Sequence, residues 1–177
     1  MEKVYGATER HDQLIVHTSG TAVLIYGYGE DDCAGYDWRE SFDTRPSSLK
    51  IRETIIAHIN DLTDAKILNG YKWTIMHGDM SKPEESRHAG ETVNVWLSME
   101  NQNNFKEAHR LACLDPSKVI PVKFKISEDS EMNAIYETFM TFEELNTFYL
   151  GAFSFIKKTL DDGWVEKESI DMTKFET

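Results

Sequence analysis

Cys113 and His109 form the one pairing of a nucleophile with a base that the sequence suggests. They stand four positions apart in a segment with helical periodicity, so they would share one face of a helix. A catalytic thiol also needs the activation that a helix N-terminus or a nearby cation provides, whereas Cys113 falls at the far end of that segment. We therefore interpret both as ordinary helix residues, and the sequence predicts no catalytic residue.

The other candidates for metal or cofactor binding lack the spacing that such sites need. Six histidines and two cysteines contain neither a Cys-x-x-Cys nor a His-x-x-x-His pair, which are typical of zinc sites. The consecutive carboxylates at 30–32 diverge, whereas Ca²⁺ and Mg²⁺ need converging oxygens. Gly27 and Gly29 follow a predicted strand, but no third glycine completes a dinucleotide motif. The sequence predicts no metal site and no cofactor.

A run of polar residues is the first candidate for binding a partner. It includes Asn101, Asn103 and Asn104 and opens a predicted helix, although asparagine is a mediocre helix former. Such a run either lines a polar groove or satisfies the free amides of the first helical turn. We keep both interpretations.

Spaced aromatic side chains are the second candidate. Tyr36, Trp38 and Phe42 alternate with polar residues in the segment 30–47, which predicts an extended arm that buries these rings in a neighbouring protein. The four tryptophans and nine phenylalanines are also a possible surface for recognising sugar or peptide, although such residues more often form a core.

The elements that would position these residues begin with a β-hairpin. Two β-branched runs at 14–17 and 22–26 flank Ser19-Gly20, a two-residue turn signal. The glycines at 27 and 29 predict the end of the second strand, before the arm.

The rest of the chain predicts alternating helices and strands. First we expect a helix from Ser47 or Ser48 to about 64, then one or two strands within 67–75 and a polar surface loop at 77–92. Next come a strand at 93–97 and a helix that Ser98 caps and Asp115-Pro116 ends. The last elements are an antiparallel pair of strands at 119–126 and 134–139, and a long helix that begins at the Thr141–Glu144 capping box and stops at Gly163.

These elements predict an α+β fold, with an N-terminal β-hairpin and extended arm followed by a helix–strand–helix–β-hairpin–long helix domain. We expect three parts: residues 1–47 as the hairpin and aromatic docking arm, residues 48–164 as the main domain, and residues 165–177 as a polar, extended tail.

Composition excludes several classes of protein. With 177 residues, 40% of them hydrophobic, the chain can bury a core without disulfides. A net charge of −12 repels polyphosphates, so we expect no nucleic-acid partner. No apolar run approaches the roughly 20 residues of a membrane span. Two isolated cysteines and the lack of a signal peptide predict synthesis in a reducing cytoplasm.

Nine segments of the chain are shared with a known group of sequences: 17–21, 26–29, 35–39, 66–73, 95–106, 121–125, 148–149, 162–164 and 166–171. Through these segments the chain resembles a family of small uncharacterised proteins encoded by phages and prophages of gut bacteria, and more loosely a domain of unknown function in phage tail-associated proteins. The segment 77–92 is longer here than in those relatives, which makes it an accessory loop. The family contributes no motif of known chemical role.

The resemblance implies a non-enzymatic structural or accessory protein of a bacteriophage particle, located in the virion at the tail, neck or head surface. Its expected partners are other virion proteins and further copies of itself, because closed symmetric oligomers are the usual assembly. Two alternatives stay open. One is a module that recognises a glycan or receptor on the host surface, through the polar run or the tryptophans. The other is a non-virion phage protein that inhibits a host factor.

Overall fold

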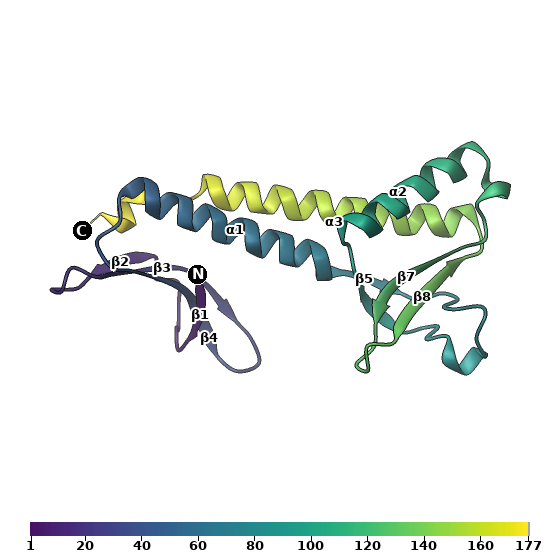
Figure 1. The fold of residues 1–177 in the computed structure, drawn as a ribbon, viewed down its shortest axis with the longest axis horizontal. Coiled ribbons are helices and arrows are strands. Elements are labelled where there is room, and N and C mark those ends of the chain that lie inside the picture. The colour runs from purple at the N-terminus through teal and green to yellow at the C-terminus, as the bar shows by residue number, and fades with distance from the viewer. Residues whose placement is uncertain (177) are drawn as a thin grey trace. The chain divides into compact units, whose positions relative to one another are not determined.

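The computed structural model describes residues 1–176, which form an α+β fold, and so confirms the predicted class (Figure 1). The elements in chain order are β1 (Glu2–Tyr5), β2 (Gln13–Val16), β3 (Ala22–Glu30), β4 (Gly35–Phe42), α1 (Ser48–Gly70), β5 (Tyr71–Thr74), the 3₁₀-helix η1 (Glu84–Ser86), β6 (Thr92–Val95), α2 (Met99–Leu114), η2 (Pro116–Lys118), β7 (Val122–Glu128), β8 (Ala134–Phe139), α3 (Phe142–Glu168) and η3 (Met172–Phe175).

The chain forms two compact units, whose boundaries differ from the three parts expected from the sequence. The first unit contains residues 1–62 and 163–176, and the second contains residues 63–162. The divisions therefore fall inside α1 and α3 and not at residue 47. The physical reason is that each long helix has contacts in both units. Ile55 of α1 lies in the core of the first unit and Ile67 in that of the second, while α3 places Phe148 in the core of the second unit and binds Tyr26 of the first unit through Glu166.

The first unit contains a four-stranded antiparallel sheet in the order β1-β4-β3-β2. The predicted hairpin is β2 and β3, and its turn contains Gly20 at a φ of 93°. The second strand does not end at the glycines as expected. It continues to Glu30 with a shift of register between Tyr26 and Gly29, and a Cβ at Gly29 would collide with the ring of Tyr36.

The arm expected at 30–47 is a strand of this sheet. The alternation of Tyr36, Trp38 and Phe42 correctly indicated extended backbone, but β4 pairs with β1 on one side and β3 on the other. The expectation of an arm separate from the hairpin is therefore wrong, while docking on a partner stays a prediction. Periodicity does not predict this pairing, because β1 has only four residues and no alternation of apolar and polar side chains.

The core of the first unit lies between this sheet and the first half of α1 (Figure 1). Ile51, Ile55 and Ile59 form an apolar stripe along α1, each at most 4% exposed, and pack with Leu24 of β3. Phe175 of η3 joins the same core at 3% exposed. The prediction of an extended tail is therefore wrong for residues 172–175, which form η3, because Phe175 anchors this segment in the core.

Helix α3 also passes through Gly163, where a stop was expected, and ends at Glu168. Its last turns are tied to the sheet of the first unit: the Tyr26 hydroxyl donates to Glu166 at 2.6 Å, and Arg10 donates to the same carboxylate at 3.1 Å. These long-range bonds stabilise helix beyond a residue that locally favours termination.

The second unit contains two antiparallel ribbons, β5-β6 and β7-β8, with α2 and α3. One backbone bond, from Trp96 N to Ile126 O at 2.7 Å, joins the two ribbons. The core is aromatic: the ring of Phe148 lies 5.0 Å from those of Trp73 and Phe105 and 4.9 Å from that of Phe139.

Local signals at the helix ends of this unit are confirmed. Ser98 caps α2 by accepting from Asn101 N at 3.2 Å, and Thr141 and Glu144 form the reciprocal capping box of α3. Helix α1 is longer than expected, because it continues to Gly70 with Ile67 buried, and the strand after it shortens to β5.

Candidate binding groove

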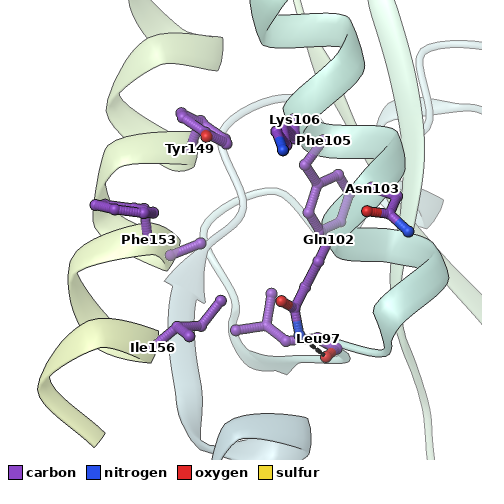
Figure 2. A pocket seen from close by; sticks show the side chains of 9 residues that line it. Leu97, Gln102, Asn103, Phe105, Lys106, Tyr149, Phe153 and Ile156 are labelled. Atoms are coloured by element: carbon purple, nitrogen blue, oxygen red, sulfur yellow. Dashed lines mark hydrogen bonds between the residues drawn. The ribbon is translucent and has the colours of Figure 1, made fainter. Parts of the chain in front are cut away.

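A groove of about 280 Å³ lies between α2 and α3 in the second unit. Figure 2 shows residues of α3 along one side and residues of α2 along the other, with Leu97 at one end. The lining residues are Leu97, Gln102, Asn103, Phe105, Lys106, Tyr149, Ala152, Phe153 and Ile156.

The groove follows from helical spacing and from one small residue. Tyr149, Ala152, Phe153 and Ile156 are three or four positions apart, so they share one face of α3. Ala152 fills little space between larger neighbours, and together with the buried Phe105 it forms the apolar floor. A hollow therefore opens where two helices meet around an alanine.

Stacked rings fix the aromatic wall of the groove. His109 of α2 stacks on Tyr149 with ring centroids 4.2 Å apart and an interplanar angle of 17°. His109 Nε2 also lies 2.8 Å from Asn146 Oδ1, which holds the imidazole ring in place. Tyr149 then stacks on Phe153 with centroids 6.4 Å apart, while Phe153 stays 54% exposed. The wall is ordered before any ligand arrives.

Polar groups stand on the opposite rim. Gln102 donates through Nε2 to the Leu97 carbonyl at 2.7 Å, which leaves its amide oxygen available. Lys106 takes part in none of the ion pairs formed by residues 1–176, and the neighbouring Glu107 is bound at both oxygens by Arg110, at 2.7 and 2.9 Å. The arrangement suits a ligand with an apolar body and an anionic group.

The polar run at 101–104 is divided between two roles. Asn103 lies in the lining of this mainly apolar groove, and a role of Asn103 in binding a partner stays a prediction. Asn101 donates through Nδ2 to the Trp96 carbonyl at 2.7 Å and so fastens the start of α2 to the preceding segment. Asn104 is exposed and does not line the groove. A binding role for Asn101 and Asn104 stays a prediction.

The predicted aromatic residues of β4 contact their own unit. Tyr36 lies edge-on to Tyr5 at 5.9 Å and to Trp38 at 5.7 Å, and Trp38 packs on His58 of α1 at 4.6 Å. Phe42 packs against the core of the first unit. A role of these three in binding a partner stays a prediction, but they are held in a sheet.

The Cys113–His109 pair is close but poorly oriented for proton transfer. Cys113 Sγ lies 3.9 Å from both ring nitrogens of His109. A sulfur equidistant from both nitrogens lies on the bisector of the ring and not along the lone pair of either one. A thiol there does not donate in line to a base, and Nε2 already faces Asn146.

Sequence reasoning missed a buried carboxylate, Glu137, which is fully buried on β8. It accepts five hydrogen bonds of 2.7–3.1 Å, one from the Trp73 indole and four from backbone amides at residues 76, 77, 78 and 138. Strand alternation could have revealed it, since Glu137 falls on the same face as the buried Ile135 and Phe139.

The start of the loop at 77–92 is anchored by further polar contacts, while most of the later residues are exposed as predicted. His77 Nε2 lies 3.1 Å from Glu144, and Asp79 accepts from Ser81 and from Lys123 Nζ at 3.0 Å. The bonds from Ser81 and the charge of Lys123 lower the pKa of Asp79 to about 2. These contacts hold the loop against the rest of the unit, because His77 and Asp79 each have a bonding partner within the fold.

Residues 1–176 contain no cluster of three or more histidine, cysteine or acidic side chains placed to hold a metal ion. In the part of the chain that the structure describes, no helix has both the length and the apolar character needed to cross a membrane. No protein-family model matches the chain, and it matches no curated protein and no solved structure.

Proposed function

We propose that this protein is a non-enzymatic binding component of a bacteriophage particle, which uses the α2–α3 groove to hold an apolar side chain of another particle protein. The observation that carries the proposal is the groove itself: an apolar floor, a stacked aromatic wall and one unpaired cation on the rim. The placement in a phage particle rests on the family resemblance.

The dimensions of the groove favour a single side chain or a short helical segment over an extended ligand. A hollow of about 280 Å³ accepts a leucine, methionine or phenylalanine side chain with its neighbours resting on the rim. Because Phe153 is half exposed and apolar, covering it removes unfavourable surface from water. Protein partners present such anchors at the centres of their interfaces.

The charge on the rim defines the partner further. Lys106 stands next to the apolar lining without a bound acid, so we expect the partner to place a carboxylate beside its apolar anchor. The chain as a whole carries a net charge of −12, which disfavours a uniformly acidic partner. The best fit is a segment with one acidic residue next to a large apolar residue.

A role in binding agrees with how the ionisable side chains are used. The carboxylate of Glu137 is saturated with five donors, and the imidazole of His109 is held by stacking and by Asn146. Both groups serve to position elements of the fold, and the groove presents side chains suited to contact.

The test is incorporation into purified particles, measured by quantitative mass spectrometry. We expect the wild-type protein in the particles, and a loss of at least about tenfold for Phe153→Ala and for Lys106→Glu. The matched control is Leu114→Ala, since Leu114 is also an exposed apolar residue, on α2, but lies outside the groove.

Two results would contradict the proposal. Particles without any trace of the wild-type protein would exclude a virion role, and pull-down from infected cells would then show whether a host protein is the partner. Equal incorporation of the Phe153 and Leu114 variants would instead exclude the groove as the contact.

A further inference from the structure

A second hollow of the second unit, which we call the Trp96 trough, has a different chemistry. It is lined by Leu68, Asn69, Asn94, Trp96, Ser127 and Glu128, and its volume is about 400 Å³. These residues come from the end of α1, from β6 and the residue after it, and from β7. Three segments far apart in the sequence therefore converge on one tryptophan.

Backbone pairing fixes the orientation of this tryptophan. Trp96 N donates to the Ile126 carbonyl at 2.7 Å, and Leu97 N donates to the Leu68 carbonyl at 2.9 Å. Val95 and Leu97 point into the core at 0% and 1% exposed, so strand alternation turns Asn94 and Trp96 outward together. Trp96 keeps 41% of its surface exposed.

The polar side chains around the ring are free to bind a ligand. Within residues 1–176, the side chains of Asn69, Asn94 and Ser127 make no hydrogen bond to another residue, whereas Asn101 and Asn146 are both engaged. These two amides and one hydroxyl supply donors and acceptors side by side.

A charged pair borders the trough. Glu128, which lines it, forms an ion pair with Lys125, whose ammonium lies 5.7 Å from the centroid of the Trp96 ring. The carboxylate of Glu128 accepts hydrogen bonds from hydroxyl groups, and its charge is balanced by the ammonium of Lys125.

We propose that the Trp96 trough binds a neutral hexopyranose unit of a glycan. A pyranose ring has faces of C–H groups, whose positive edges pack on the negative face of an indole. Its rim carries hydroxyl groups that both donate and accept, which matches amides, a hydroxyl and a carboxylate around one aromatic ring. The net charge of −12 disfavours sulfated or carboxylated sugars.

This site is independent of the α2–α3 groove, because the two share no lining residue. The glycan proposal therefore goes beyond the proposed function, and either one can fail alone. Particle incorporation reports on Phe153 and Lys106, whereas sugar binding reports on Trp96 and Asn94.

The experiment is saturation-transfer NMR on the full chain with four neutral probes: maltotetraose, cellotetraose, mannotetraose and lacto-N-tetraose. We expect at least one probe to receive saturation with a dissociation constant of about 1 mM, as suits a ligand that contacts the protein through one or two rings. Trp96→Ala should weaken binding roughly tenfold and Asn94→Ala severalfold. Trp164→Ala is the matched control, since Trp164 is 61% exposed with Lys167 4.7 Å from its ring centroid but lies outside the trough.

Thermal unfolding of each variant establishes that it is folded. If Trp96→Ala does not fold, Asn94→Ala and Asn69→Ala still test the site, because both asparagine side chains are exposed and their loss should not unfold the protein. The proposal is overturned if none of the four probes receives saturation at up to about 20 mM. It is equally overturned if binding persists unchanged in the Trp96 and Asn94 variants, or if a sulfated oligosaccharide binds more tightly than every neutral probe.

Discussion

Glu137→Gln is expected to lower the free energy of unfolding by about 2–6 kcal/mol. Oε1 of Glu137 accepts from three backbone amides, and Oε2 accepts from the Trp73 indole at 2.9 Å and the Met76 amide at 2.7 Å. Glutamine replaces one oxygen by an NH₂ group, so in its better orientation two donors face another donor. Each buried donor left without an acceptor costs about 1–3 kcal/mol, which gives the range.

Two measurements check this prediction. Urea unfolding reports the change in stability, and hydrogen exchange reports whether the amides at 76–78 lose protection, because these amides depend on the carboxylate. Glu131→Gln is the control, since Glu131 is exposed and accepts one long bond of 3.5 Å, and its expected effect is below about 0.5 kcal/mol. A loss below about 1 kcal/mol for Glu137→Gln, with protection at 76–78 unchanged, would refute Glu137 as the anchor of this loop.

Three further predictions concern the first unit and assembly. Phe175→Ala should reduce the free energy of unfolding by about 3 kcal/mol, because the Phe175 side chain is only 3% exposed and its removal leaves a cavity in the core. An unchanged urea midpoint would contradict the packing of η3. Burial lowers the pKa of His58, so the unfolded chain takes up a proton more readily and stability should fall as pH drops below about 6.5. His58→Phe should flatten that dependence in urea titrations between about pH 7 and pH 5, and equal slopes would show that another group is responsible. Sedimentation equilibrium should return two or more times the monomer mass, whereas a monomer at all concentrations would exclude a homo-oligomer.

Signals carried by neighbouring residues were readable from the sequence. The cap at Ser98, the capping box of Thr141 and Glu144, and the hairpin around Gly20 each depend on residues within five positions of one another. Their side chains and backbone amides meet whatever the remainder of the chain does, so local pattern was sufficient to predict them.

Features that depend on distant partners were missed. Strand β4 requires β1, which has no apolar alternation, and the extension of α3 past Gly163 requires Tyr26 and Arg10 from the first 26 residues. The local residue preferences favoured a separate arm at 30–47 and a helix stop at Gly163. Pairing with β1 and the bonds to Glu166 outweighed these preferences.

The candidate site was only partly accessible to the same reasoning. Asn103 was a candidate because of the polar run that contains it, but the groove that it lines depends on how α2 packs beside Ala152 of α3. The stacking of His109 on Tyr149 also brings together residues 40 positions apart in the sequence, which no spacing rule anticipates. The outward direction of Trp96 could be read from strand alternation, whereas its neighbours Asn69 and Ser127 could not.

The most direct test of the groove as a docking site is photo-crosslinking from its centre. A benzophenone amino acid placed at Phe153, in protein that is assembled into particles, should form a crosslink to one other particle protein at a segment with an acidic residue beside a large apolar one. The same amino acid placed at Leu114 should give no such product. Absence of any crosslink at position 153 above that control, in particles that contain the protein, would contradict the central claim.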